Sequence, residues 1–264
     1  MTEFWLGVSQ TAIGSGIGFG LGILAFHYQQ KRQADLQSKA QWKRAIDALN
    51  RLSTAAGANI EALAQSKMQL IDAMRPEVEK MKAASVDIFD TQPADRPKKL
   101  LALKAMSESL LHFYMSLPRT SIMPPPNASE YSSLSKDMPA LSLFVHRALG
   151  MMQELNERIV SRNSLIAEPA REGGAGDGMS GERLLYYSSM LASEGEAIYL
   201  HVDDAIDFWR LVADQVAAYM THMAKGEAYI EYQLAPKAIE ALPKEELFPA
   251  MRAQLVTFAN SGSA

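Results

Sequence analysis

A long uncharged stretch near the amino terminus constrains this chain more than any other feature of its sequence. Between Glu3 and Lys31 there are 27 residues without a formal charge, and the apolar part, residues 6–26, is 21 residues long. About 20 helical residues cross a bilayer core of about 30 Å. Trp5 and Tyr28 flank the apolar part, where aromatic rings favour the headgroup layer. We therefore predict one transmembrane helix here, rather than a cleaved signal or a buried helix.

The charges that flank this stretch predict its orientation. Residues 31–51 hold six Lys or Arg and two Asp, a balance of +4, whereas no Lys or Arg precedes the stretch. The positive-inside rule then places the amino terminus outside and the carboxy-terminal body in the cytoplasm. Contact with anionic lipid is expected at Lys31, Arg32, Lys39, Lys43 and Arg44. A solvated helix face explains the same charges equally well.

Glycines recur every four residues inside the apolar stretch. They form two series, Gly14, Gly18 and Gly22, and Gly16 and Gly20. Small residues four apart let helix backbones approach closely in lipid, whereas glycine otherwise costs a helix about 1 kcal/mol relative to alanine. This glycine zipper predicts a homo-oligomer or pairing with another membrane protein. The alternative is that glycine is merely tolerated there.

The composition of the remaining chain excludes several classes of function. The net charge is −4 in total and −7 outside Glu3 and residues 31–51, which argues against a nucleic-acid partner. The absence of cysteine excludes disulfides, thiolate zinc sites and cysteine nucleophiles. Together with the chain's size it favours a bacterial protein, so we expect a single-pass protein of the bacterial inner membrane.

Apolar residues at steps of three and four predict an all-α protein, with no strand alternation. We expect an antiparallel helical bundle with coiled-coil-like packing of long helices. The predicted helices are Lys31 to Phe89 with a break near Pro76, Asp95 to about Leu117, Asp137 to about Glu168, and Glu182 to Lys225. The predicted regions are a transmembrane anchor (1–30), a juxtamembrane long helix and second helix (31–117), a Pro-rich connector (118–137), two long helices joined by a Gly-rich loop (138–226), and a short-helix tail (227–264).

Three further features lie in or near these loops. Residues 124–126 are three prolines, which favour a stiff polyproline spacer over a recognition motif. Asn156 and Asn163, seven residues apart, either fix helix register from a buried seam or face solvent. The glycine-rich segment 169–181 follows no strand and carries no Gly-Lys-Ser/Thr, so we expect a flexible linker and no phosphate site.

One cluster offers candidate metal chemistry. Glu194, His201 and Asp204 are spaced to project from one face of the last long helix. Glu154 and Glu157 on the preceding helix would complete a site only if packing brought them close. The Glu-x-x-His pairs of bundle-core di-iron sites are absent, as are nucleotide-binding and serine-hydrolase signatures. We therefore predict no catalytic residue and no cofactor, and these three residues remain weak metal candidates.

The sequence points to function only in outline. The leading hypothesis is a non-enzymatic, membrane-tethered helical scaffold or adaptor that self-associates or binds a partner protein. The first alternative is a signalling or receptor-like helical module that relays a change through the membrane-proximal helix. The second is a metal-dependent enzyme that uses the acidic face around His201.

Overall fold

The chain folds as an all-helical bundle, as predicted. The computed structural model describes residues 2–134, 138, 140–171, 180–222, 224, 226–244, 248, 249 and 253, and the side chains of 2–20 and 168–171 lie outside this description. No strand occurs in these described ranges. The elements are α1 (Thr2–Ser66), the π-helix η1 (Lys67–Ile71), α2 (Asp72–Phe89), α3 (Arg96–Ser107), the 3₁₀ turns η2 (Ala128–Glu130) and η3 (Ser132–Leu134), α4 (Leu141–Arg171), α5 (Gly181–His222) and α6 (Pro236–Glu240).

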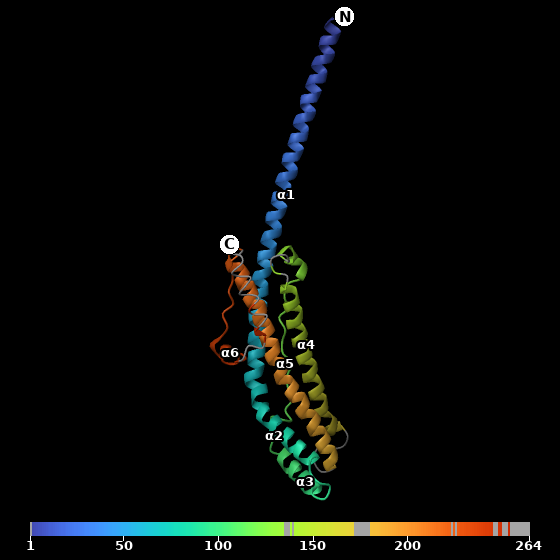
Figure 1. Ribbon diagram of the computed structural model, residues 1–264, viewed down its shortest axis with the longest axis vertical. Helices are drawn as coiled ribbons and strands as arrows, with labels where there is room; N and C mark the ends of the chain where they lie inside the picture. The colour runs from blue at the N-terminus through green and yellow to red at the C-terminus, as the bar shows by residue number, and fades with distance from the viewer. Residues whose placement is uncertain are drawn as a thin grey trace.

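Helix α1 is much longer than the bundle it belongs to. Figure 1 shows its amino-terminal half projecting alone, while its second half packs beside α4 and α5. Residues 21–41 are exposed, and Ala45 is the first residue of α1 described as buried. We call the projecting part, residues 2–41, the stalk. The end of the bundle farthest from it, where α2 meets α3, we call the distal tip.

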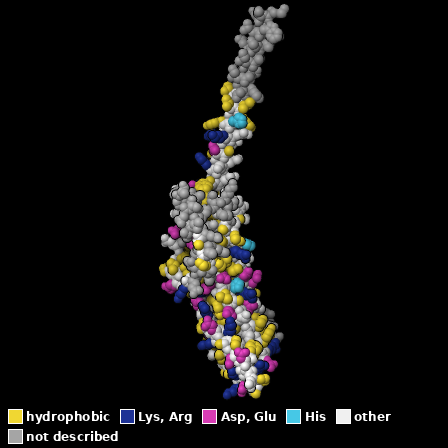
Figure 2. Space-filling view, viewed as in Figure 1, with side chains coloured by type: hydrophobic (Ala, Val, Ile, Leu, Met, Phe, Trp, Pro, Cys, Tyr) yellow, Lys and Arg dark blue, Asp and Glu magenta, His cyan; other side chains and the backbone are white. Residues whose placement is uncertain are grey.

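The predicted membrane span is not supported by the described residues. Within that part of the chain, no helix carries an apolar segment of the length that crossing a bilayer requires. The backbone of residues 2–30 is helical, but most of the predicted span, residues 6–26, has side chains outside the description. Figure 2 shows exposed apolar side chains on the stalk just beyond those atoms.

The core follows the predicted apolar stripes. Side chains from α1, α2, α4 and α5 meet in one cluster around Trp209 of α5, which is fully buried. The indole Nε1 of Trp209 donates to the sulfur of Met152 on α4, at 3.0 Å. Gly195 lets α2 approach α5 closely, because a Cβ there would lie 2.7 Å from a methyl group of Val78.

The sequence predicts a kink or a restart of the helix at Pro76, and the structure shows no restart there. Pro76 lies inside α2, and the five residues of η1, ending at Ile71, form a π-helical segment just before it. Proline has no N–H to donate, and its ring crowds the carbonyl four residues earlier. A wide π turn is one way in which a helix absorbs such a mismatch without ending. The rod from α1 to α2 is therefore continuous.

The helix predicted to reach Leu117 ends ten residues earlier, at Ser107. The hydroxyls of Ser107 and Ser109 donate to nearby backbone carbonyls and so compete with helical hydrogen bonds. The carboxylate of Glu77 on α2 accepts the backbone N–H of Phe113, at 2.6 Å. Because the N–H of Phe113 donates to a side chain distant in the sequence, it is not available for a helical hydrogen bond, and the chain does not continue as a helix.

A strap, residues 112–123, takes the place of the missing helix; it starts in a turn at residues 111–114 and has no regular secondary structure from residue 115. Its backbone is held on α4 by two asparagines. Asn163 accepts the N–H of Leu117 at 2.9 Å and donates to the carbonyl of the same residue at 2.7 Å. Asn156 pairs in the same way with Thr120, at 2.8 and 3.0 Å. Neither predicted role matches fully, because both asparagines are half-buried and bind the strap backbone, so they neither set register between helices nor simply face solvent.

A third asparagine binds the strap from α1. Asn59, which is fully buried, accepts the N–H of Met123 at 2.7 Å and donates to its carbonyl at 3.0 Å. The N–H and C=O of one extended residue point the same way, so one carboxamide satisfies both. Extended backbone in a protein interior needs such partners, because an unpaired buried polar group is costly.

Arg162 anchors the first part of the strap. Its side chain is 1% exposed, and its two Nη atoms donate to the carbonyls of His112, Phe113 and Met115. Burial lowers the pKa of the Arg162 guanidinium to about 10, so it stays charged at neutral pH. A buried cation is tolerated here because backbone dipoles replace its water.

The segment after α5 is tied to α1 in a similar way. Trp42 donates to Glu227 at 2.9 Å. Asn50 donates to the carbonyl of Ala228 and accepts the N–H of Ile230, both at 2.9 Å. Gly226, with φ of 92°, makes the turn that follows α5, as expected of the glycine predicted to end that helix. The predicted helix over residues 249–258 lies largely outside the described residues.

Gly57 is unfavourable for a helix by propensity, but here it allows close packing of the tail. The ring of Tyr232 lies directly on α1 at this point, and a Cβ at position 57 would overlap it. The Tyr232 hydroxyl donates to Glu61 at 2.8 Å, and the N–H of Ala235 donates to the same carboxylate at 2.9 Å. The missing side chain is what lets the tail lie flat on the helix.

We predict that Asn59→Ala lowers the free energy of unfolding by about 2–3 kcal/mol, because two hydrogen bonds vanish and the N–H and C=O of Met123 lose their partner. Urea unfolding of the full chain in mild detergent measures this. Gln65→Ala is the matched control, since Gln65 is exposed on the same helix. Equal effects of the two substitutions would contradict the role of Asn59.

A second pair of substitutions tests the tail. Gly150→Ala on α4, where a Cβ meets nothing within 4 Å, should stabilise the protein by up to about 1 kcal/mol through helix propensity. Gly57→Ala should instead destabilise it and expose residues 228–235 to hydrogen exchange, because the Tyr232 ring is displaced. Stabilisation by both changes would show that the tail does not depend on this contact.

Candidate functional site

The three weak metal candidates lie on α5 but do not converge on one point. Glu194 faces Arg158 of α4, and His201 faces Glu154 of α4. Asp204 forms no such ion pair with any described residue and lies one turn further along α5. Within the described ranges, no group of three or more His, Asp or Glu side chains is arranged to hold a metal ion.

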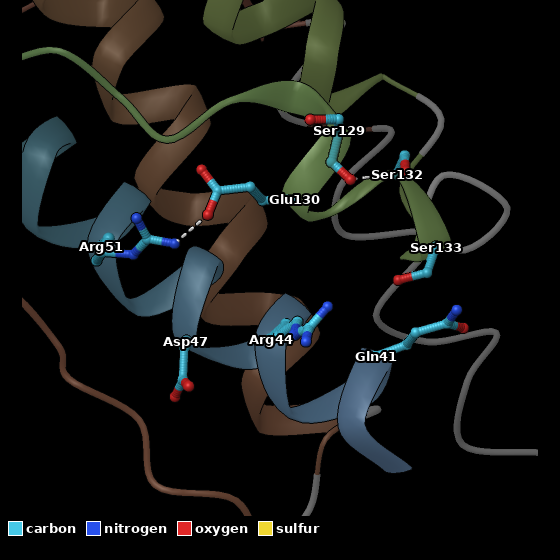
Figure 3. Close-up of a pocket in the computed structure, with 8 residues that line it drawn as sticks. All are labelled: Gln41, Arg44, Asp47, Arg51, Ser129, Glu130, Ser132 and Ser133. Atoms are coloured by element: carbon cyan, nitrogen blue, oxygen red, sulfur yellow. Dashed lines mark hydrogen bonds and ion pairs between the residues drawn. The ribbon is translucent and has the colours of Figure 1, made fainter. Parts of the chain in front are cut away.

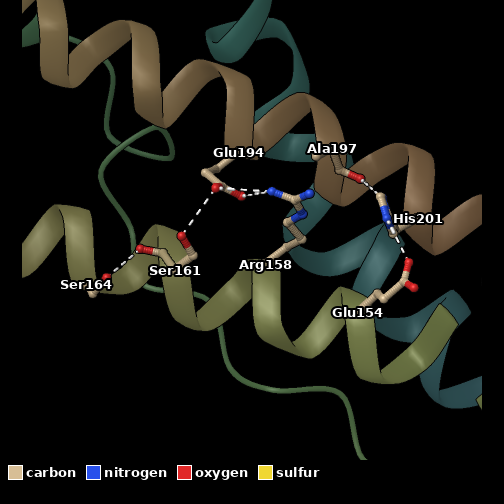
Figure 4. A network of polar contacts seen from close by, with 7 residues as sticks. All are labelled: Glu154, Arg158, Ser161, Ser164, Glu194, Ala197 and His201. Carbon is tan, nitrogen blue, oxygen red and sulfur yellow. Dashed lines mark hydrogen bonds and ion pairs between the residues drawn. The ribbon is translucent and has the colours of Figure 1, made fainter. Parts of the chain in front are cut away.

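Glu194 belongs to a small polar network at the seam between α4 and α5 (Figure 4). Arg158 reaches both of its carboxylate oxygens at 3.4 Å, and the hydroxyl of Ser161 donates to it at 3.2 Å. The Glu194 side chain is 14% exposed, so these contacts replace most of its water. The sequence pattern identified this carboxylate, but its cationic partner became apparent only from the packing.

His201 lies further along the same seam and contacts both helices. One ring nitrogen, Nδ1, lies 2.7 Å from the carbonyl of Ala197 and therefore carries the hydrogen of that bond. The other, Nε2, lies 3.4 Å from Glu154, with which it pairs when the ring is protonated. A small hollow of about 230 Å³ opens beside it. Of the groups that line it, His201 pairs with Glu154, and Arg158 and Ser161 pair with Glu194, so the evident effect of these contacts is to tie α4 to α5.

A separate charged group lies where the π-helix meets α5. The Lys67 ammonium contacts Asp203 at 2.5 Å, and the two side chains are only 13% and 29% exposed. Burial raises the pKa of the Asp204 carboxyl; the charge of His201 opposes this shift, and those of Asp203 and Asp207 add to it. The two neighbouring carboxylates of α5 thus have opposite environments. Asp203 is paired with the Lys67 ammonium, whereas Asp204 is desolvated and has no Lys or Arg partner among the described residues.

A pocket of about 610 Å³ lies at the end of the bundle next to the stalk (Figure 3). It is lined by Gln41, Arg44, Asp47 and Arg51 of α1 and by Ser129, Glu130, Ser132 and Ser133. Arg51 pairs with Glu130 across it, and this hydrogen bond, with one from the backbone of Asn127, lowers the pKa of the Glu130 carboxyl. Its two arginines and two carboxylates balance in charge, and Arg51 already has Glu130 as a partner.

The predicted lipid-contact residues are all exposed on α1. Lys31, Arg32 and Lys39 lie on the stalk, and Lys43 and Arg44 lie where it joins the bundle. Their contact with lipid stays a prediction. Of the glycine face, Gly22 has open space around it, whereas Gly14, Gly16, Gly18 and Gly20 lie outside the described side chains.

Two substitutions distinguish the neighbouring carboxylates of α5. Asp203→Asn should lower the free energy of unfolding by about 1–2 kcal/mol, because it leaves the Lys67 charge half-buried without a partner. Asp204→Asn should raise it at neutral pH. A carboxyl with a raised folded-state pKa favours folding fully below its unfolded pKa of about 3.9, and this benefit is lost as pH rises through the folded pKa.

Denaturant unfolding of both variants and the parent chain between pH 3.5 and 8 checks this. The advantage of Asp204→Asn should shrink as the pH falls toward the lower end of that range. An advantage that does not change with pH would mean that burial of the charge is not its cause.

Comparisons with known proteins add no assignment. No protein-family model, no curated protein and no solved structure matches this chain. Function therefore has to be argued from the chain's own surfaces. Those surfaces are the stalk, the polar seam between α4 and α5, the charged group between η1 and α5, and the pockets.

Proposed function

We propose that this protein is a non-enzymatic scaffold or adaptor, tethered to a bacterial inner membrane by the first part of α1. The observation that carries the proposal is the apolar surface of the stalk. Leu21, Leu24, Phe26 and Tyr28 are 57–69% exposed, and nothing in the described chain covers them. A bilayer, into which residues 6–26 would insert, accounts for this surface.

The continuous helix from the stalk to α2 would set the distance between the membrane and the distal tip. From residue 27, just beyond the apolar stretch, to the end of α2 at Phe89, the chain stays helical throughout. At 1.5 Å per residue this distance is about 95 Å. An adaptor built this way would hold its distal tip far from the bilayer surface, with the body in the cytoplasm.

Self-association through the glycine face completes the proposal. Gly14, Gly18 and Gly22 would let two copies, or one copy and another membrane protein, pack closely in lipid. The basic residues from Lys31 to Arg44 would rest near anionic headgroups.

Membrane fractionation of the full chain, followed by alkaline carbonate washing, tests the tether. We expect the protein to remain in the membrane pellet and Gly18→Ile to abolish its crosslinked dimer by separating the helix backbones. Ala12→Ile is the control, since Ala12 is a small residue outside both glycine series. Release by carbonate would exclude the tether, and unchanged crosslinking of Gly18→Ile would exclude pairing through the glycine face.

A further inference from the structure

A pocket of about 390 Å³ lies at the distal tip, where α2 ends and α3 and α5 begin. Its walls are mainly apolar and come from Phe89, Leu185, Tyr186 and Met190. Sites that bind small groups are typically concave and apolar, with a few polar groups that fix orientation. This pocket has that composition.

The apolar surface continues outside the pocket along two adjacent helices. Val86 and Phe89 on α2 are 52% and 58% exposed, and Tyr186 and Met190 on α5 are 60% and 39% exposed. Spacings of three and four place each pair on one face of its helix. Exposed apolar groups gathered around a concavity indicate an interaction site rather than random surface exposure.

Two polar atoms in the pocket lack partners. The Nε–H of Arg96 and the hydroxyl of Ser189 are both shielded from solvent, and neither has a hydrogen-bond partner. No hydrogen bond or ion pair is recorded for the rest of the Arg96 guanidinium in the described part of the chain. The Nε–H of Arg162 also lacks a partner, but both Nη groups of Arg162 donate to backbone carbonyls, so the two arginines differ at their Nη groups.

A guanidinium whose Nη groups lack protein acceptors, beside an apolar wall, is complemented by a ligand that carries both an anionic acceptor and a hydrocarbon group. Both must fit in about 390 Å³, so they must lie a few ångströms apart. A polypeptide meets this condition at its carboxyl terminus, where a carboxylate and an apolar side chain are attached to one Cα.

We propose that the distal pocket binds the free carboxyl terminus of a partner protein that ends in an apolar residue. The Nη groups of Arg96 donate to the terminal carboxylate, and the last side chain lies between Phe89, Tyr186 and Met190. This names the partner chemistry of the adaptor and so rests on the proposed function for its biological role, although binding itself does not require the membrane tether.

Glu182 also lines the pocket and is exposed at the start of α5. Its carboxylate opposes an incoming anion, which weakens binding. Replacing it with an uncharged isostere should therefore strengthen binding of a free carboxyl terminus. The same replacement should not affect a peptide whose terminus is amidated.

The test measures binding of two fluorescent tetrapeptides, dye-Gly-Gly-Leu-Leu with a free carboxylate and the same peptide with a terminal amide, to the full chain in lipid nanodiscs. We expect the free acid to bind about tenfold or more tightly than the amide, as a charge-assisted hydrogen bond would give. Arg96→Met should abolish this difference, and Glu182→Gln should increase affinity for the free acid by about twofold.

Lys98→Met is the matched control, because it removes an exposed positive charge two residues away on α3 and should leave binding unchanged. Circular dichroism of each variant shows whether the bundle is intact. Equal binding of acid and amide, no binding of either, or equal losses in Arg96→Met and Lys98→Met would overturn the proposal. Carbonate washing of the same preparations separates failure of this proposal from failure of the tether.

Discussion

The pairing of side-chain amides with extended backbone is the interaction on which this bundle depends. The long helices α1, α2, α4 and α5 leave one side of the core open. The strap, which is not helical, covers this side. Asn156 and Asn163 are seven residues apart, about 10.5 Å along the helix axis, and they bind Leu117 and Thr120, which are three residues apart on the strap. A polyproline-II-like chain has three residues per turn and rises about 3.1 Å per residue, so residues three apart face the same way about 9 Å apart. The two repeats match, so a regular helix can bind an extended chain at successive points.

This match links the polar and apolar parts of the core. Phe113 and Leu117 are buried on the strap, and they can remain so only while the backbone that carries them is hydrogen-bonded. Arg162 serves both needs, since its charge satisfies carbonyls that a helix would have satisfied internally. Removing one side chain that binds the strap therefore weakens apolar packing as well as hydrogen bonding. For this reason such a network stabilises the fold by more than the sum of its separate contacts.

The sequence predicted the long helices well because their signal is periodic and local. It failed at the end of α3, because the N–H of Phe113 is bound by Glu77, a partner far away in the sequence. Nothing local in the sequence shows why position 57 is glycine, because the Tyr232 ring that occupies the place of its side chain lies 175 residues later. The candidate site failed for the same reason: spacing put Glu194, His201 and Asp204 on one face, but the positions of Arg158 and Glu154 on α4 decide what those groups do.

The distribution of satisfied and unsatisfied groups supports a protein that acts at its two ends. Between them, charged side chains such as Lys67, Asp203 and Glu194 are paired within the chain, and the strap and tail backbones are bound by helix side chains. Toward the stalk, apolar side chains around Phe26 project without a partner. At the distal tip, Arg96 and an apolar hollow do the same. The proposed membrane tether and the proposed carboxyl-terminal ligand would each cover one of these two ends.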